Sequence, residues 1–165
     1  MSKKEEPSKG PVLVIGSNSF CGSHFTSHLL RNGYEVVGVS RSSEPDDVFL
    51  PYKWIKSDGF KFRFNKMDIN SDLEDLIELI QRERPAYIAN FSAQGMVSQS
   101  WDSPEDWYRT NLVSQVKICE SIRRFDFLVR YLHFTTPEVY GNTEGWITEE
   151  SAFNPSTPYA VSRAA

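Results

Sequence analysis

Apolar residues along the chain form short runs rich in valine, isoleucine and aromatic side chains. Each run is bounded by glycine, proline or polar residues, which is the pattern of buried β-strands. The stretch 41–59 is polar, and Pro45 and Pro51 argue against regular structure there. On this basis we predict five strands, over residues 12–15, 34–40, 60–64, 86–91 and 127–134.

Segments of helical periodicity separate these strands. Gly33 ends the first segment, as glycine commonly does just past a helix. Ser71 and Glu74 form a capping box at the start of the second, which Pro85 stops. Ser103 opens the third, with a proline in its first turn. We therefore predict helices over residues 23–32, 72–84 and 104 to about 124, and a further helix from 159 onward.

Strands that alternate with helices form βαβ units. The chain is therefore predicted to have an α/β fold, a Rossmann-like doubly wound parallel sheet with helices on both faces. Residues 1–10 are charged and polar, and we expect a disordered tail before a single domain over 11–165. Ligands of such sheets bind outside the carboxyl ends of the strands. The residues that follow each strand are therefore the ones to inspect.

Composition excludes several classes of function. The net charge of −4 without a basic block gives no surface for nucleic acid or anionic membranes. No apolar run approaches the roughly 20 residues that cross a bilayer, and the N-terminus lacks the apolar segment of a signal peptide. Cys21 and Cys119 lie in predicted helices and do not suggest a disulfide framework. A reducing, cytoplasmic setting fits best.

The turn after the first predicted strand carries the first chemical signal. Gly16 and Gly22 stand six residues apart, with Ser19 midway. The first glycine allows a tight turn and the last lets helix and strand pack closely, while free N–H groups at the helix start attract a phosphate. Glycine is also common in any tight strand-to-helix turn, so this spacing alone leaves both interpretations open.

The end of the second predicted strand bears on the choice of dinucleotide. An acidic residue there binds the ribose hydroxyls of NAD, whereas an arginine suits the 2′-phosphate of NADP. Ser40 ends this strand and Arg41 follows it, with no acid at either position. This favours NADP over NAD, and the alternative is that Arg41 is a solvated loop cation.

A tyrosine and a cation stand at helical spacing near the C-terminus. If a helix begins at Tyr159, Arg163 lies on the same face one turn later. The cation favours the phenolate and makes Tyr159 a usable base near neutral pH, and a hydroxyl such as that of Thr136 can share the proton path. The alternative is that Tyr159 and Arg163 are only a surface pair at the start of a helix, which would have the same spacing.

Six short motifs are more specific together than any one alone. They are Gly16-x-x-Ser19-x-x-Gly22, Asp68-Ile69, Asn90-Phe91-Ser92-Ala93-Gln94, Thr110-Asn111, Thr136-x-x-Val139-Tyr140-Gly141 and Pro158-Tyr159-x-x-x-Arg163. With them, the chain from about Val12 to its end resembles the extended short-chain dehydrogenase/reductase family. The likeness is greatest to the nucleotide-sugar epimerases and 4,6-dehydratases.

This resemblance implies that residues 11–165 are an NAD(P)-binding Rossmann domain. The turn 16–22 would hold the pyrophosphate, Asp68 and Ile69 would contact the adenine, and residues 92–94 would line the nicotinamide side. No metal site is expected. The residues expected to bind the cofactor are Gly16, Ser17, Asn18, Ser19, Phe20, Cys21, Gly22, Ser40, Arg41, Asp68, Ile69, Phe91, Ser92, Ala93, Gln94, Tyr159 and Arg163.

The resemblance also implies a set of catalytic residues, Thr136, Glu138, Tyr159 and Arg163. Thr136 and Tyr159 would flank the C4 hydroxyl of the sugar, and Glu138 resembles the glutamate with which dehydratases remove the C5 proton. The implied reaction is 4,6-dehydration, with hydride removal at C4 and water loss across C5–C6. A C4 epimerase, in which Glu138 is a bystander, and a non-catalytic dinucleotide sensor or scaffold are the alternatives.

Three positions depart from the family pattern. Ser19 replaces the middle glycine, although its hydroxyl is able to donate a hydrogen bond to the pyrophosphate. Pro137 stands where some dehydratases have an aspartic acid. Arg163 stands where the family has lysine, and a forked guanidinium is not equivalent to an ammonium group. All three departures favour the non-catalytic alternative.

The family continues past the position of Ala165 with further strands and a smaller substrate domain. We therefore expect a C-terminally truncated fragment without its substrate domain, inactive by itself and a weak binder of NADP(H). Its fifth strand is expected to be an uncovered edge. The expected partners are a nucleotide-sugar and a second copy in a homodimer. The apolar residues expected at that edge are Val129, Tyr131, Leu132 and Phe134.

Overall fold

The computed structural model describes residues 10–55, 59 and 61–165. Residues 1–9 of the predicted tail and Phe60, the first residue of the third predicted strand, lie outside the described part. The described chain forms one sheet of five parallel strands in the order β3-β2-β1-β4-β5, so the predicted parallel sheet is confirmed. The strands are β1 (Val12–Ile15), β2 (Val36–Ser40), β3 (Phe62–Lys66), β4 (Tyr87–Asn90) and β5 (Arg130–His133).

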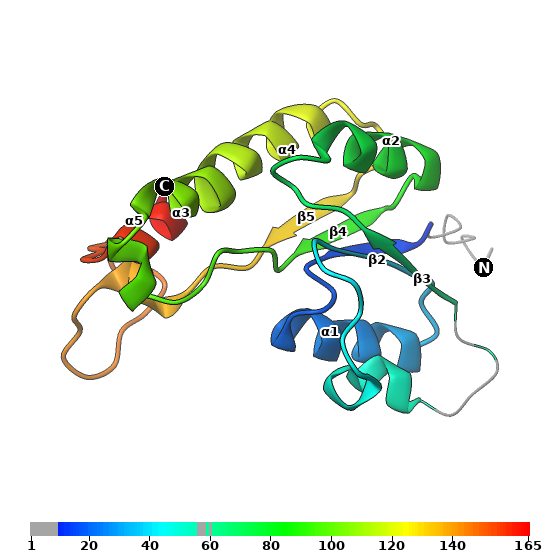
Figure 1. The fold of residues 1–165 in the computed structure, drawn as a ribbon, viewed down its shortest axis with the longest axis horizontal. Coiled ribbons are helices and arrows are strands. Elements are labelled where there is room, and N and C mark those ends of the chain that lie inside the picture. Colours follow the sequence, from blue (N-terminus) through cyan, green and yellow to red (C-terminus); the bar gives the residue numbers. More distant parts are fainter. Residues whose placement is uncertain (1–9, 56–58, 60) are drawn as a thin grey trace, which may run out of the picture.

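Helices cover both faces of this sheet, as predicted. Figure 1 shows α1 on one face and α2 with α4 on the other. The α-helices are α1 (Phe20–Arg31), α2 (Leu73–Glu83), α3 (Pro104–Tyr108), α4 (Ser114–Ile122) and α5 (Pro158–Ala164). The shorter turns are η1 (Asp47–Phe49), η2 (Pro51–Trp54), η3 (Ser98–Trp101), η4 (Arg109–Val113) and η5 (Pro137–Tyr140).

The alternation of side chains along β1 builds two cores. Leu13 and Ile15 point to the face covered by α2 and α4, where they pack with Val37, Ile80 and Ile118. Val12 and Val14 point to the opposite face, where α1 and η2 cover them. Because each strand residue is buried from one side or the other, β1 and all of β2 except its last residue, Ser40, lack polar side chains, as expected for parallel strands with two covered faces.

Two local expectations at helix ends had different outcomes. Gly33 adopts a positive φ of 78° just past α1 and ends that helix, as predicted. The prediction of a capping box formed by Ser71 and Glu74 is wrong. Ser71 donates instead to the carboxylate of Asp72, and that carboxylate accepts the N–H of Asp68, so both groups are used in the turn before α2.

The predicted long helix from Ser103 is helical, but its middle is not α. A π-helical turn, η4, joins α3 to α4. Such a turn inserts an extra residue and rotates the side chains that follow it. It buries Thr110 and Asn111 against the ends of the strands.

Strand β5 is an edge of the described sheet, as predicted. Val129, Leu132 and Phe134 beside it are largely exposed, and Tyr131 is half-buried. In Figure 1 the segment after β5 leads to η5 and to a loop that extends away from the sheet before α5 returns. No helix in the described part of the chain is long and apolar enough to cross a membrane.

Candidate functional site

The chain reverses its direction of travel across the sheet between β1 and β4. From β1 it goes to β2 and β3 on one side, then crosses back to β4 and β5 on the other. Such a switch point opens a crevice at the carboxyl ends of the strands. A cavity of about 240 Å³ lies there. The residues that line it are Ile15, Gly16, Asn18, Ser19, Ser40, Arg41, Ser42, Met67, Asp68, Ile69, Asn70, Phe91, Ser92, Ala93 and Thr110.

The turn after β1 needs its two glycines for different reasons. Gly16 has a φ of 83°, and a Cβ there would lie 2.8 Å from the backbone of Phe91 and Ser92. A Cβ on Gly22 would lie 2.1 Å from the carbonyl oxygen of Gly16, so the helix start packs directly on the turn. Both requirements agree with the roles that the sequence analysis gave to these glycines, a tight turn at Gly16 and close helix packing at Gly22. Together the two residues form a tight backbone cradle at the cavity.

Ser19, which replaces the middle glycine of the family pattern, is the N-cap of α1. Its hydroxyl donates to the Gly16 carbonyl at 2.7 Å and accepts the N–H of Gly22 at 3.1 Å. The serine proton is thus used within the turn and is not directed at a ligand in this structure. The N–H groups of Phe20 and Cys21, at the start of α1, have no protein acceptor among the described residues.

The end of β2 presents a cation and hydroxyls to the cavity. Arg41 is exposed at the mouth, where its guanidinium donates to Gln94 Oε1 at 3.2 Å. Ser40 is buried, and its hydroxyl accepts the Asn18 N–H at 3.0 Å. The Arg41–Gln94 contact spans the mouth from the end of β2 to the loop after β4. A negative group entering there meets the guanidinium first.

The segment after β3 supplies the wall beside Arg41. Asp68 is half-buried, its Oδ1 accepts the Asn70 N–H at 2.9 Å, and Ile69 is buried in the core below. The Asn70 side chain donates to the Thr110 hydroxyl and accepts from the Ser114 hydroxyl. This wall therefore joins an apolar surface, suited to a flat ring, to polar groups fixed by hydrogen bonds.

Buried amides hold the backbone after β4. Asn90 is fully buried, and its Oδ1 accepts both the N–H and the hydroxyl of Ser92, at 2.9 and 2.6 Å. Asn111, from the π-helical turn, accepts the Gln94 N–H at 2.7 Å and donates to the Gln94 carbonyl at 3.0 Å. The same amide donates to the Ser162 hydroxyl on α5 at 3.0 Å. Asn111 thus joins the cavity wall to the last helix.

The four predicted catalytic residues lie on two neighbouring elements. Thr136 and Glu138 belong to η5 and its N-cap, and the Thr136 hydroxyl accepts the Glu138 N–H at 3.4 Å. Tyr159 and Arg163 lie on α5, which begins at Pro158, one residue before the predicted start. The Thr135 hydroxyl donates to the Arg163 carbonyl at 2.9 Å and so ties the two elements together. None of the four lines the cavity itself.

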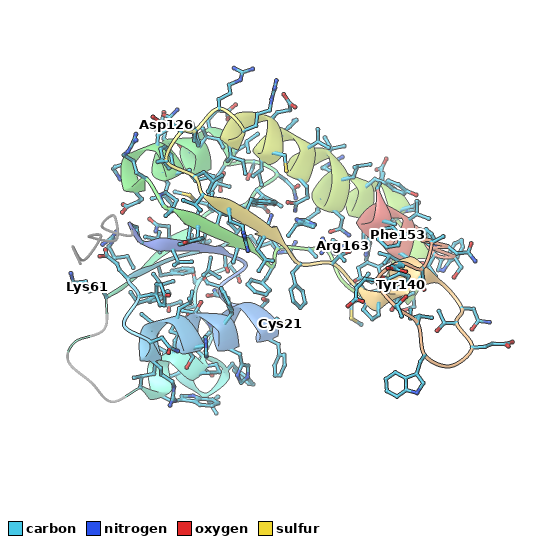
Figure 2. The ribbon with its side chains drawn as sticks, turned by 180° about the vertical axis from the view of Figure 1, so that it is seen from behind. Cys21, Lys61, Asp126, Tyr140, Phe153 and Arg163 are labelled. Carbon is cyan, nitrogen blue, oxygen red and sulfur yellow. The ribbon has the colours of Figure 1, made fainter. Side chains whose placement is uncertain are left out.

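Arg163 is the least satisfied polar residue of this group. Figure 2 shows it where the chain leaves β5. It is 7% exposed, and one of its nitrogens donates to the Phe134 carbonyl. Its Nε and Nη1 are buried and have no partner among the described residues. Burial lowers the pKa of Arg163, although the guanidinium stays charged. A buried cation with two free donors needs an acceptor.

The structure therefore divides the predicted site residues into two groups. Ten of the predicted cofactor contacts line the cavity: Gly16, Asn18, Ser19, Ser40, Arg41, Asp68, Ile69, Phe91, Ser92 and Ala93. The others lie around it: Ser17 is buried below the turn, Gly22, Phe20 and Cys21 start α1, Gln94 contacts Arg41, and Tyr159 and Arg163 are on α5.

Sequence reasoning missed several residues that line the cavity. Asn70 lies two residues past Asp68, and Thr110 belongs to a motif that was noticed but given no role. Thr110 and Asn111 reach the site because the π-helical turn rotates them inward. The pattern of apolar residues in the sequence does not predict such a turn. Ser42 was passed over beside Arg41.

Comparison with known proteins adds a family profile described as GDP-mannose 4,6 dehydratase, which matches residues 13–165. The dTDP-glucose 4,6-dehydratase of Neisseria meningitidis is 28% identical over 165 residues, covering 93% of the chain and 46% of that protein. The chain spans about half the length of the curated relatives it matches.

Two solved structures share the fold at 25% sequence identity. MoeE5 in complex with UDP-glucuronic acid and NAD has a TM-score of 0.78, and the match covers 93% of the chain and 46% of MoeE5. The UDP-glucose 4-epimerase from Brucella ovis in complex with NAD also has a TM-score of 0.78, over 93% of the chain and 44% of the epimerase.

Proposed function

The chain belongs to the GDP-mannose 4,6 dehydratase family, and on this premise we propose that it is the NAD(P)-binding part of a nucleotide-sugar 4,6-dehydratase. The cavity at the switch between β1 and β4 carries the proposal. Its glycine cradle leaves no room for a Cβ at Gly16 or Gly22, and the two free N–H groups at the start of α1 suit a pyrophosphate. The residues present therefore fit a dinucleotide.

The preferred dinucleotide is proposed to be NADP. Arg41 offers a guanidinium at the cavity mouth, and Ser40 and Ser42 beside it supply hydroxyl and backbone groups. No acid stands where the ribose hydroxyls of NAD would be held. A 2′-phosphate would replace Gln94 as the partner of Arg41 and gain a charge-assisted contact.

The proton chemistry is assigned to η5 and α5. When bound, the nicotinamide accepts and returns hydride at the sugar carbons. Thr136 and Tyr159 would hold the C4 hydroxyl and take its proton, and Glu138 would remove the C5 proton so that water leaves across C5–C6. Arg163 lies one turn further along α5 than Tyr159 and is proposed as the cation beside its hydroxyl.

A C4 epimerase is the second candidate. The solved structure of the Brucella ovis UDP-glucose 4-epimerase, with NAD bound, shares the fold of the whole described sheet at 25% identity. In that case hydride would leave and return at C4, and Glu138 would take no part. Under either candidate we propose a nucleotide-sugar substrate, a homodimer and a cytoplasmic location for the domain 11–165.

Calorimetric titration of the protein with NADP and NAD tests the cofactor part. We expect NADP to bind about tenfold more tightly, and Arg41→Ala to remove that preference. Arg124→Ala, which removes an exposed arginine beyond the far end of α4, is the matched control and keeps it. Equal affinities in the unaltered protein, or a preference for NAD, would contradict the assignment.

Product mass separates the two reactions. The complete gene product is incubated with NADP and a set of nucleoside-diphosphate sugars, and the sugar product is analysed by mass spectrometry. A dehydratase product is lighter by one water, and Glu138→Gln prevents that loss. An unchanged mass, with an inverted C4 centre in the proton NMR spectrum of the product, identifies the epimerase instead.

A further inference from the structure

The first acidic residue after β2 is Glu44, three positions past Arg41, and its carboxylate is bound on both sides. The Tyr52 hydroxyl donates to Glu44 Oε1 at 2.8 Å. Lys53 Nζ lies 3.2 Å from each carboxylate oxygen. This acid is thus held by a hydrogen bond from Tyr52 and an ion pair with Lys53, two neighbours on the same short turn, η2.

Tyr52 is a rigid donor. It is 5% exposed, packs in the core under α1, and its ring lies 4.6 Å from that of Phe62. Burial and the Glu44 carboxylate raise the pKa of Tyr52, so its hydroxyl stays protonated and keeps donating at any physiological pH. A ring held in this way fixes where the Glu44 carboxylate lies.

The same hydroxyl stands next to the cavity. Its oxygen is 3.4 Å from Asn18 Oδ1, and Asn18 lines the cavity. The side-chain Nδ2 of Asn18 donates to the carbonyls of Ser42 and Ser43, at 3.1 and 3.2 Å. It thereby holds the loop after Arg41 over the glycine turn. A single hydroxyl therefore separates Glu44 from the residue that anchors the loop.

A free carboxylate at this point would change what the loop recognises. It would repel a 2′-phosphate, and it would accept hydrogen bonds from the two ribose hydroxyls of an unphosphorylated nucleotide. We propose that Tyr52 and Lys53 are positioning residues, which hold Glu44 away from the cavity and so preserve the preference of Arg41 for a phosphorylated ribose. This inference rests on the proposed binding of NADP.

The test compares affinities for NADP and NAD, measured by calorimetry, in variants that release Glu44. Tyr52→Phe keeps the ring in the core and removes only the hydroxyl, and Lys53→Gln removes the exposed cation. We expect the ratio of the NAD to the NADP dissociation constant to fall about threefold in each variant and about tenfold in the double variant. Adding Glu44→Gln to the double variant should restore the original ratio.

The rescue distinguishes a charge effect from a disturbed fold. A lower ratio that Glu44→Gln does not restore, or a ratio that stays unchanged in the double variant, overturns the inference while leaving the proposed NADP preference intact. If the unaltered protein does not prefer NADP, the proposed function itself fails and the inference fails with it. Lys53→Gln lies at the surface, so it still decides the matter if Tyr52→Phe does not fold.

Discussion

The two ends of the candidate site differ in how completely their polar side chains are paired. At the end formed by β1, α1 and β2, the Asn18 amide, the Ser40 hydroxyl and the Glu44 carboxylate all have partners within the protein. At the end formed by β5, η5 and α5, the Arg163 guanidinium has two buried nitrogens without a partner among the described residues. Phe134 beside it is half-exposed.

This difference indicates how each end of the site affects ligand binding and the stability of the protein. Paired side chains fix the first end before any ligand arrives, so it would hold the proposed nucleotide without rearrangement. Unpaired buried donors raise the free energy of the second end, and an incoming acceptor relieves that cost. The first end is therefore expected to lose stability when altered, whereas the second is expected to gain stability when its unpaired charge is removed.

Gly22→Ala should have the largest effect. The new Cβ would meet the Gly16 carbonyl at 2.1 Å, so helix and turn must separate and the cradle opens. We expect the free energy of unfolding to fall by about 4 kcal/mol and NADP binding to be lost. Thermal unfolding followed by circular dichroism, together with calorimetric titration, measures both.

Gly33→Ala is its matched control. Gly33 has a positive φ of 78°, which Gly22 inside α1 does not have, but a Cβ at Gly33 would meet no atom of the described residues within 4 Å. The strain alone costs about 1 kcal/mol, and nucleotide binding should be kept. Equal losses in the two variants would show that the close approach of α1 to the turn adds nothing to the cost of a side chain at Gly22.

Asn111→Ala tests the connection between the two ends. It removes three hydrogen bonds, two to the Gln94 backbone and one to Ser162, and leaves a buried N–H unpaired. We expect a loss of about 3 kcal/mol in the free energy of unfolding. Ser162→Ala breaks the link from Asn111 to α5, together with the bond from the Ser162 hydroxyl to the Tyr159 carbonyl, and should cost about 1 kcal/mol. Similar losses in denaturant titrations of the two variants would mean that Asn111 does not hold the cavity wall.

The end formed by β1, α1 and β2 was largely readable from the sequence. The apolar runs located all five strands, and the spacing of Gly16 and Gly22 located the cradle, because backbone geometry demands those residue types at those places. Arg41 was found because it directly follows a strand. Local rules suffice where each residue acts on its neighbours in the chain.

The features of the site that the sequence did not predict depend mostly on contacts between residues that are not neighbours in the chain. The pairing of Glu44 with Tyr52 arises because η2 folds back on the loop after β2, within a stretch expected to be irregular. Asn111 reaches Gln94 and Ser162 through the π-helical turn. The capping box at Ser71 failed for a local reason, because the Ser71 hydroxyl donates to the neighbouring Asp72 carboxylate and the helix begins one residue later than expected. Patterns of single residues do not record such partners.

Arg163→Met addresses the unpaired end directly. It replaces a buried cation, which has no carboxylate partner in the part of the chain that the structure describes, with an apolar side chain of similar length. We expect the free energy of unfolding to rise by about 1–2 kcal/mol, while the affinity for NADP falls about tenfold. Arg163→Lys, which keeps a charge, should change both less. A destabilised Arg163→Met protein in the same denaturant titration would place Arg163 among the structural groups.

His133 should give the smallest effect, and it reports on the same end of the site. Loss of water around its ring, and next the Arg163 guanidinium, lower the pKa of His133 to about 4 from an ordinary value of 6.5. The unfolded chain therefore binds more protons between these two values than the folded chain does. Its free energy of unfolding falls as the pH falls from about 6.5 to about 4.

The size of this effect is limited because His133 remains partly exposed to water, so we expect less than about 1 kcal/mol across that interval. His133→Gln should flatten the slope of stability against pH in urea titrations, relative to the unaltered protein. Arg163→Met should raise the pKa of His133, followed by NMR of the imidazole protons, because the nearby cation no longer opposes protonation. If the pKa of His133 does not change in Arg163→Met, the charge of the Arg163 guanidinium has no electrostatic effect on the imidazole ring.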